Sequence, residues 1–387
     1  MERGDCSLSG VKRFDAIVVG GGPAGSTTAY HLAAAGASVL LVDKATFPRD
    51  KPCGGGVTTR AAQQCPVDVS PVVEAEVDIV ELRFRYRDSV ERRSSEPVIR
   101  MTQRRRLDAF LLDAARAQGV EVREGVKAEL DPSSTSLLLS GGERVQADAI
   151  VGADGANGMT ARAFGLATGI AHGVAYEGNV PYGVVSRERY ARRAVVEFAD
   201  IPGGYGWVFA KGDHVNVGVG AWQAQGPRIR QHLARLCAAH HLDPAQLTAL
   251  RGHRLPYRRG GARIAGDRVL LVGDAAGLID PVSGDGMYEC FVSARLAAAA
   301  VDDLLAGRAA TLEPYQPAVD LALAPLHRAS WKLKQALDRW PRATWQVART
   351  QLLWRSVERL LLGELSAPQQ QYGLARLPLR ALDVLGR

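Results

Sequence analysis

The stretch FDAIVVGGGPAG, residues 14–25, decides the fold of this 387-residue chain. Its short apolar run is typical of a buried strand in a parallel sheet, and glycines follow with the G-x-G-x-x-G spacing over residues 20–25. The alanine-rich segment 26–35 predicts a helix that ends near Gly36, and residues 39–42 predict a second strand. Strand, glycine turn, helix and strand together predict the βαβ unit of a dinucleotide-binding sheet.

The three glycines and the acid after the second strand have separate physical tasks. Gly20 permits a sharp turn, Gly22 lets the backbone approach a pyrophosphate, and Gly25 allows the helix to pack on the sheet. The free N–H groups of the helix N-terminus then face the phosphates. Asp43 is placed to accept a hydrogen bond from a ribose 2′-hydroxyl and would repel a 2′-phosphate. This pattern favours FAD or NAD over NADP, and the alternative is a glycine-rich turn without a ligand.

Two later glycine–acid motifs favour a flavin. IVGADG, residues 150–155, and VLLVGDAA, residues 269–276, each place a carboxylate at the end of a buried strand, where doubly wound sheets bind ligands. Asp274 is placed to hold a ribityl hydroxyl. Gly284 and Gly286 lead into a helix whose N-terminus can stabilise negative charge on a reduced flavin. Either motif alone is also typical of a turn with a capping Asp.

The hydrophobic pattern changes period along the chain. Residues 80–87 alternate apolar and charged side chains, as a half-exposed antiparallel strand does, and residues 175–221 also favour strands. Helical spacing covers 229–241, 286–305 and most of the chain beyond 312. We predict an α/β fold in which a Rossmann-type FAD-binding domain (1–75, 101–170 and 256–311) is interleaved with an antiparallel-sheet, α+β substrate domain (76–100 and 171–255) and followed by a C-terminal helical segment (312–387).

Taken together, these motifs resemble FAD-dependent oxidoreductases of the p-hydroxybenzoate hydroxylase type over most of the chain. The resemblance implies that the 20–25 motif binds the ADP part, that Asp154-Gly155 lies between the flavin and the reductant, and that Asp274 contacts the ribityl chain. Arg104 occupies the place of an arginine near the FAD, with its neighbours 105 and 106 as competitors. The residues expected to hold the cofactor are Gly20, Gly22, Pro23, Ala24, Gly25, Asp43, Lys44, Cys53, Gly54, Gly55, Arg104, Val126, Asp154, Gly155, Asp274, Pro281, Gly284, Gly286 and Met287.

Two further segments are similar to the geranylgeranyl reductase family. KPCGGG, residues 51–56, is similar to its cysteine–glycine loop. The segment YGWVFAKGDHVNVGVG, residues 205–220, is similar to its YxWxFP…NVGxG signature, with Ala210 in place of the proline. In that family the loop approaches the flavin, and the resemblance implies that Cys53 acts in gating or in proton supply. The alternative for this residue is a buried structural cysteine.

The second of these segments also has a direct physical interpretation. Tyr205, Trp207 and Phe209 share one face of a strand, because side chains alternate along it. On the returning strand, Gly218 and Gly220 leave room for another group to approach. An aromatic wall beside an open groove suits a long hydrocarbon, so we expect these five residues to bind substrate. The alternative is that the aromatic rings only fill the core between sheet and helices.

We therefore predict an enzyme, a FAD-dependent reductase that saturates carbon–carbon double bonds of a prenyl (geranylgeranyl-type) chain on a lipid, quinone or diphosphate. Reduced FAD would deliver a hydride from N5, and Cys53, or a water that it orients, would supply the proton. The face of Trp207 could stabilise developing positive charge. The sequence has no second G-x-G-x-x-G unit, so the expected reductant is NAD(P)H in a transient site or a reduced electron carrier.

Two other functions remain open from the sequence. A flavin monooxygenase would use the same FAD frame to hydroxylate a hydrophobic substrate, but the 51–56 loop and the 205–220 signature disfavour it. A non-catalytic prenyl-binding protein on a related fold, such as a Rab escort protein, needs no flavin. The acids Asp43, Asp154 and Asp274 therefore disfavour it.

Composition limits the remaining classes. Hydrophobic residues make up 47% and charged residues 23% of the chain, which predicts a folded core. No apolar run reaches the roughly 18 residues of a membrane-spanning helix. The charged start, residues 1–5, is not typical of a secretory signal, so we expect a cytoplasmic protein. Five cysteines without a CxxC pair predict neither a metal site nor a disulfide framework, and Cys237 and Cys290 are expected in the core. Cys6 and Cys65 complete the set.

The net charge of +7 is spread along the chain and predicts no nucleic-acid partner. In the tail, four tryptophans are mixed with lysines and arginines. These tryptophans are Trp331, Trp340, Trp345 and Trp354. Such helices could either make peripheral contact with an anionic membrane or cover the substrate domain with their basic side chains solvated. The sequence does not predict an oligomeric state.

Overall fold

The computed structural model describes residues 11–386, so the charged start and Cys6 lie outside the described residues. The first sheet has seven strands, ordered β8-β2-β1-β11-β10-β9, with β17 beside β11. Its strands are β1 (Lys12–Val19), β2 (Val39–Asp43), β8 (Glu121–Glu124), β9 (Ala128–Leu130), β10 (Ser136–Leu139), β11 (Arg144–Gly152) and β17 (Val269–Leu271). Five strands run parallel, namely β8, β2, β1, β11 and β17. Strand β10 pairs antiparallel with β11, and β9 pairs antiparallel with β10. The parallel strands end on one edge, which gathers the predicted motifs there.

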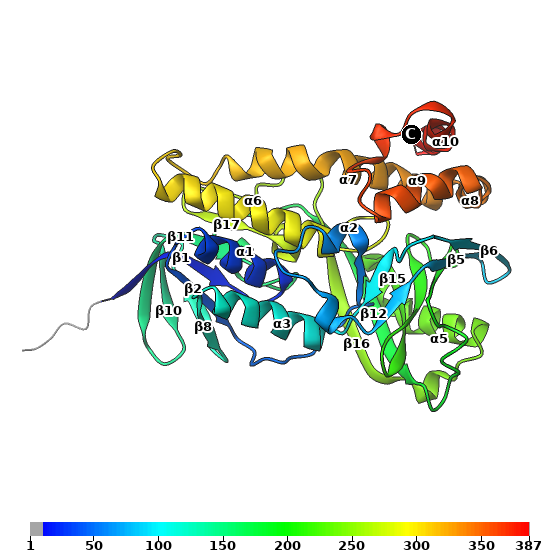
Figure 1. Ribbon diagram of the computed structural model, residues 1–387, viewed down its shortest axis with the longest axis horizontal. Helices are drawn as coiled ribbons and strands as arrows, with labels where there is room; N and C mark the ends of the chain where they lie inside the picture. The colour runs from blue at the N-terminus through cyan, green and yellow to red at the C-terminus, as the bar shows by residue number, and fades with distance from the viewer. Residues whose placement is uncertain (1–10, 387) are drawn as a thin grey trace, which may run out of the picture.

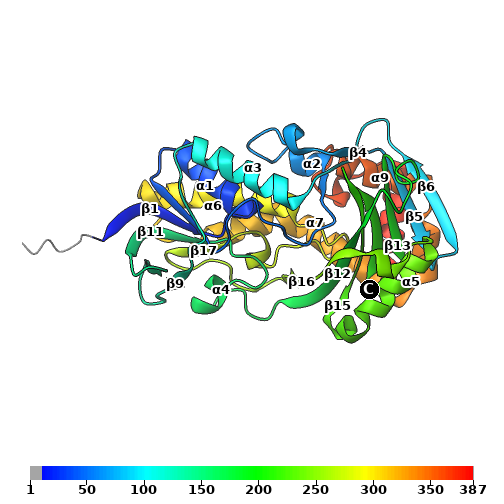
Figure 2. The same ribbon diagram turned by 90° about the horizontal axis from the view of Figure 1, so that it is seen from below.

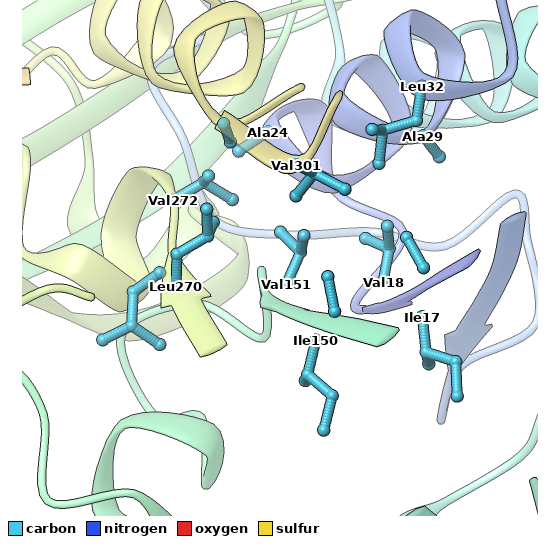
Figure 3. Close-up of a cluster of buried hydrophobic side chains, with 14 of the residues drawn as sticks. Ile17, Val18, Ala24, Ala29, Leu32, Ile150, Val151, Leu270, Val272 and Val301 are labelled. Atoms are coloured by element: carbon cyan, nitrogen blue, oxygen red, sulfur yellow. The ribbon is translucent and has the colours of Figure 1, made fainter. Parts of the chain in front are cut away.

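Three helices cover one face of this sheet (Figure 1). They are α1 (Pro23–Ala34), α3 (Arg104–Ala117) and α6 (Met287–Leu305). Side chains such as Leu32 of α1 and Val301 of α6 pack above Val18 and Val151 of the strands (Figure 3). Helix α1 begins at Pro23, earlier than the predicted residue 26, because the fixed φ of proline suits the first helical turn.

The second sheet also has seven strands, ordered β16-β12-β15-β14-β13-β5-β6. Its strands are β5 (Ile79–Phe84), β6 (Asp88–Arg93), β12 (Ala171–Pro181), β13 (Arg193–Phe198), β14 (Tyr205–Ala210), β15 (His214–Trp222) and β16 (Thr248–Tyr257). Neighbours pair antiparallel except β5 and β13, which are parallel. Helix α5 (Ile229–Ala239) covers one face, where Val208 and Val217 pack against Leu236 and Cys237. The opposite face is left for the C-terminal helices.

A small sheet, β3-β7-β4, completes the strands. It is formed by β3 (Gly56–Thr58), β4 (Ala75–Val77) and β7 (Ile99–Met101), with α2 (Thr59–Ala62) directly after β3, and α4 (Thr160–Ala163) follows β11. The tail forms α7 (Tyr315–Arg339), α8 (Pro341–Ala348), α9 (Gln351–Leu361) and α10 (Arg376–Leu385). Figures 1 and 2 show α7 running from the first sheet toward the second, where α8, α9 and α10 lie. The predicted α/β class, with a Rossmann-type sheet, an antiparallel sheet and C-terminal helices, is confirmed.

Two of the tail tryptophans do not face solvent. Trp345 and Trp354 are each 3% exposed, and Trp331 stacks on Trp222 of the second sheet. Trp340, which is 49% exposed, has the surface position that membrane contact requires. The idea that this tryptophan set forms a membrane face is therefore wrong for Trp345 and Trp354, because their apolar rings are covered by the fold.

Candidate active site

One large cavity, of about 1420 Å³, joins the two sheets and the C-terminal helices. At one end it is lined by the glycine turn between β1 and α1, and by the ends of β2, β11 and β17. Its middle is bounded by the 51–56 loop and by the turn before α6. Its far end lies between the open face of the second sheet and helices α7 to α10.

The glycine turn leaves space where a pyrophosphate would lie. A Cβ on Gly22 would meet only the guanidinium ends of Arg49 and Arg104, at 3.6 and 3.9 Å. A Cβ on Gly25 would instead lie 1.8 Å from the carbonyl oxygen of Gly20. Gly25 therefore lets α1 lie close on β1, as predicted, but it does not line the cavity.

Asp43 lies at the cavity end of β2. Its Oδ2 accepts the N–H of Gly21 at 2.7 Å and its Oδ1 accepts the N–H of Ala45 at 2.8 Å. Each carboxylate oxygen keeps a further lone pair for a ligand hydroxyl. Val126 lies beside it, because its N–H donates to the Asp43 carbonyl at 2.9 Å, and both residues line the cavity with Lys44.

Asp154 serves partly as a helix cap. Its Oδ2 accepts the N–H groups of Met159 and Thr160, at 2.7 and 2.9 Å, near the start of α4. Its Oδ1 is buried without a hydrogen-bond partner. The capping interpretation of this motif is thus correct for one oxygen, while the other remains for a ligand. Gly155 lines the cavity next to it.

A lysine, a histidine and a carboxylate meet just after the end of β17. Lys51 Nζ lies 3.2 Å and His253 Nε2 lies 3.7 Å from Asp274 Oδ2. Burial alone would raise the pKa of Asp274, but Lys51 and His253 outweigh it and hold the pKa well below its ordinary value. Asp274 is therefore ionised and can accept hydrogen bonds from hydroxyl groups.

Arg104 is the arginine of its segment that lines the cavity. It is 7% exposed and makes two hydrogen bonds to Asp108, at 2.6 and 2.8 Å, whereas Arg105 and Arg106 lie on the outer side of α3. Arg49 also contacts Asp108, at 3.0 Å. This bidentate geometry holds the Arg104 guanidinium at the cavity wall.

The loop that contains Cys53 is held by hydrogen bonds to both backbone groups of this residue. The N–H of Cys53 donates to Glu177 Oε1 at 2.7 Å, and its carbonyl accepts from Lys211 Nζ at 2.9 Å. Its Sγ accepts the N–H of Gly55 at 3.4 Å. Glu177 is 8% exposed, and burial raises its pKa. These contacts fix the loop against the second sheet.

The three aromatic residues of β14 form one continuous wall. The ring centroids of Tyr205 and Trp207 are 5.9 Å apart, and those of Trp207 and Phe209 are 6.5 Å apart. A Cβ on Gly54 would lie 3.0 Å from the Phe209 ring, so the cysteine–glycine loop packs directly on this wall. The wall faces the cavity, and Gly220 lines it as predicted.

Gly218 differs from its predicted role as an open surface. A Cβ there would lie 2.1 Å from the Trp207 indole, which covers this glycine, and Gly218 does not line the cavity. The indole Nε1 donates to Asn216 Oδ1 at 2.7 Å, which holds the ring in this position. The room left by Gly218 is therefore used by the wall itself.

The far end of the cavity is apolar. Strands β5 and β13 contribute side chains such as Leu82 and Val196, and the helices contribute the rest. The helical contributors include Leu333, Leu337, Trp345, Ala348, Leu353, Trp354, Val357 and Leu361. Such a lining removes water and suits a hydrocarbon.

Most predicted site residues meet at this cavity. Besides those described above, Gly20, Pro23, Ala24, Pro281, Gly284, Gly286 and Met287 line it. The sequence analysis did not single out Glu177, Lys211, His253 or Asp285, which also belong to the site. Asp285 stands between two predicted glycines, and this was a signal that could have been used.

The residues that line the nucleotide end of the cavity fit FAD. Gly22 leaves open space, Arg49 and Arg104 supply positive charge beside it, and the unpartnered Oδ1 of Asp154 and the ionised Asp274 supply acceptors for hydroxyl groups. The fold and this set of groups define a flavoprotein oxidoreductase. Comparison with known proteins agrees with this class, because the FAD binding domain family matches residues 13–312.

Similar sequences define the family more narrowly. A chloroplastic geranylgeranyl diphosphate reductase of Oryza sativa is 31% identical over 358 residues, covering 84% of this chain and 74% of that protein. A geranylgeranyl diphosphate reductase of Synechocystis is 32% identical and covers 73% of each chain. A menaquinone reductase of Mycobacterium tuberculosis is 30% identical and covers 74% of this chain and 76% of its own. The chain belongs to the geranylgeranyl reductase family of FAD-dependent oxidoreductases.

Solved structures share the fold. A geranylgeranyl bacteriochlorophyll reductase-like protein of Thermoplasma acidophilum superposes with a TM-score of 0.82 at 22% identity, covering 96% of this chain and 100% of that one. A flavin-dependent brominase superposes with a TM-score of 0.73 at 18% identity, covering 91% and 94%. At these identities the likeness concerns the fold alone.

Proposed function

We propose that this enzyme saturates carbon–carbon double bonds of a prenyl chain carried by a lipid, quinone or diphosphate. The observation that supports this most is the continuity of the cavity. Its nucleotide end and its apolar end meet where Gly54 packs on the wall formed by Tyr205, Trp207 and Phe209. A ring held beside Gly54 and a hydrocarbon held along the wall would share this junction. The names of the related reductases point to the same class of substrate.

The proposal assigns tasks to residues of the chain. When bound in reduced form, FAD supplies a hydride. Asp274 and the free oxygen of Asp154 hold its hydroxyl groups, and Arg104 faces its phosphates. The apolar far end excludes water, which could otherwise trap a cation-like centre on the alkene. The face of Trp207 stabilises developing positive charge. The reductant that recharges the cofactor is NAD(P)H or a reduced electron carrier.

Cys53 lines the cavity at the junction and is one candidate for proton supply, either directly or through a water that it orients. Its backbone and its sulfur are both engaged in holding the loop. A Cys53→Ser variant keeps a hydrogen-bonding group of similar size. If this variant keeps full turnover, Cys53 has no part in the chemistry.

Anaerobic turnover tests the proposal. The FAD-loaded enzyme, reduced with dithionite, is incubated with geranylgeranyl diphosphate, a menaquinone and a geranylgeranylated chlorophyll precursor. Mass spectrometry should find a gain of two hydrogens per reduced bond. If no prenyl compound gains mass, and the enzyme with NADPH consumes oxygen and hydroxylates a hydrophobic compound, the protein is a monooxygenase instead. A purified protein that takes up no FAD would favour a non-catalytic binder.

The proposal includes peripheral contact with an anionic membrane beside the cavity opening. Within residues 11–386, no helix is both long and apolar enough to cross a bilayer. The outer side of α10 and the turn before it expose four large apolar side chains, between 53% and 74% exposed. These are Tyr372, Leu374, Leu377 and Val384. Arg376 and Arg380 are exposed on the same helix and line the cavity, so anionic headgroups complement this face.

Vesicle co-sedimentation tests this contact. Vesicles that contain an anionic phospholipid should bind the wild type, and a Leu374→Ser/Leu377→Ser variant should bind several-fold less. Leu321 is 82% exposed and belongs to a different helix, α7, so Leu321→Ser is the matched control. Equal binding by all three proteins, or no binding of the wild type to the anionic vesicles, would contradict the contact.

A further inference from the structure

Four ionisable side chains converge at the N-terminal end of α6, beside the glycine turn that precedes this helix. Asp285 precedes the helix and lines the cavity, and Glu289 lies one turn further along the helix. Arg60 reaches them from α2, and His327 from α7. Glu289 is fully buried, and Arg60 is 8% exposed with its guanidinium 4.4 Å from the Tyr288 ring centroid.

This cluster has hydrogen-bonding capacity that the described residues do not use. Asp285 Oδ1 accepts the N–H of Met287 at 2.8 Å, but its Oδ2 is buried without a partner. Glu289 Oε1 lies 3.3 Å from His327 Nε2, and its Oε2 is likewise unpartnered. Two guanidinium nitrogens of Arg60 are also unpartnered. A buried carboxyl oxygen is costly when ionised and unpaired, so the neutral acid is favoured there.

The surroundings of Asp285 favour its protonated form. Burial, the charge of Glu289 and the more distant Asp280 raise the pKa of Asp285 to about 7, although Arg60 and the Met287 N–H act in the opposite direction. Burial lowers the pKa of His327, but its contact with Glu289 outweighs this and raises it. The protonated form of His327 is therefore favoured beside Glu289, and the Asp285 carboxyl keeps its proton to a higher pH than an ordinary aspartate. A carboxyl group whose pKa lies near the working pH can act as a general acid.

Asp285 also lies beside the aromatic wall. The Tyr205 hydroxyl donates to the carbonyl of Ser283, and a Cβ on Gly284 would lie 2.9 Å from the same hydroxyl. Burial, with nearby acidic groups that include Asp285, raises the pKa of Tyr205, so this phenol stays neutral. The turn that carries Asp285 therefore packs against the first ring of the wall along which a hydrocarbon would lie.

We propose that Asp285 is the acid that protonates the alkene carbon, and that Cys53 is a positioning residue of the loop. This inference rests on the proposed function and deepens it. The bond balance is simple: the two electrons and one hydrogen come as the hydride of the reduced cofactor. The π bond breaks, and the second carbon takes the proton from Asp285. The resulting carboxylate regains a proton from water, with His327, whose side chain is 12% exposed, linking the pair toward solvent.

Substitutions with a pH profile test the assignment. Asp285→Asn should lower prenyl reduction about 100-fold or more, since it keeps an oxygen acceptor but has no acidic proton. Asp285→Glu should recover part of the rate. The wild-type rate should fall above about pH 7, as Asp285 loses its proton. Cys53→Ser should keep this profile. Asp302→Asn, on the exposed side of α6, is the control for a change of charge on the helix.

Infrared spectroscopy provides a readout that does not depend on turnover. The difference spectrum between the FAD-loaded wild type and Asp285→Asn should contain the C=O band of a protonated carboxyl at pH 6, and this band should disappear by pH 8.5. Glu289→Gln should move the loss of the band to lower pH, because it removes the repulsive charge.

The outcomes separate this inference from the proposed function. If the wild type reduces no prenyl compound, the proposed function fails. If the wild type reduces one and Asp285→Asn matches it at every pH, this inference alone fails. The absence of the carboxyl band at pH 6 also overturns it.

Discussion

The two ends of the cavity are built by different means. At the nucleotide end, backbone geometry sets the shape: Gly25 lets a helix touch a strand, and Gly22 leaves space in front of the turn. At the apolar end, side chains from β14, α8 and α9 set the shape, and outside the 205–220 segment no short motif specifies it. The comparison teaches that nucleotide binding and the choice of substrate reside in separable parts of the chain.

The largest effect is expected at the nucleotide end. A Gly25→Ala substitution places a Cβ 1.8 Å from the Gly20 carbonyl oxygen, so α1 must move away from β1. FAD affinity should fall by more than about 100-fold, because the turn and helix N-terminus lose their alignment. The ratio of flavin to protein absorbance after purification, and a fluorescence titration with FAD, measure this loss.

Gly36 provides the matched control. Its φ is 93°, in the region that favours glycine, but a Cβ there would meet no atom within 4 Å. Gly36→Ala should cost about 1 kcal/mol of stability from backbone conformation and leave FAD affinity unchanged. If both variants bind FAD as the wild type does, the close contact of α1 with β1 is not what forms the nucleotide site.

The next effect is expected at the apolar end. Ala348 of α8 lines the cavity, and Ala348→Trp should fill part of the space along which a long chain lies. The KM for a twenty-carbon prenyl substrate should rise about tenfold or more relative to a ten-carbon one, because the longer chain loses apolar contacts. FAD affinity should not change. Steady-state kinetics with the two chain lengths measure the difference.

Ala343 lies on the same helix but is exposed, so Ala343→Trp should leave the selectivity for chain length as in the wild type. If Ala348→Trp raised the KM of both substrates equally and also lowered the affinity for FAD, the two ends of the cavity would not be separable.

The smallest effect concerns stability in acid. His240 is buried in the second sheet's core region, 2% exposed, and burial lowers its pKa to about 3. The unfolded chain takes up a proton near pH 6.5 but the folded chain does so only near pH 3, so stability falls as the pH falls between these values. The slope is at most about 1.4 kcal/mol per pH unit. His240→Phe should lose this slope, as urea unfolding at several pH values would measure. Identical slopes in both proteins would contradict it.

Local sequence patterns predicted the nucleotide end of the cavity. The roles of residues at the apolar end depend on tertiary packing and could not be predicted in the same way. The positions of Gly20, Gly25 and Asp43 follow from strand–turn–helix geometry, which is written in adjacent residues. The role of Gly218 could not be predicted, because it depends on how the indole of Trp207 turns across the neighbouring strand. Trp345 was equally ambiguous, since the same amphipathic pattern fits a membrane surface and a cavity wall.

The surroundings of the buried acids Glu177 and Asp285 could not be predicted from the sequence for the same reason. Glu177 lies on a strand with no motif of its own, and its contact with Cys53 joins residues 124 positions apart in the sequence. Asp285 stands in a predicted turn, but its burial beside Arg60 and Glu289 depends on how α2 packs against α6. Ionisation of such groups is a property of the assembled fold, not of the residue type.

The central claim is that the flavin ring and a prenyl chain meet at the junction between Gly54 and the β14 aromatic wall. The most direct measurement is a crystal structure of the FAD complex with a fully saturated geranylgeranyl analogue, which cannot be reduced further. The account predicts the ring against Gly54 and the chain between Trp207 and the helices α8 and α9. A chain bound on the outer surface, or a ring with Gly54 and Trp207 on opposite sides of the molecule from it, would contradict the account.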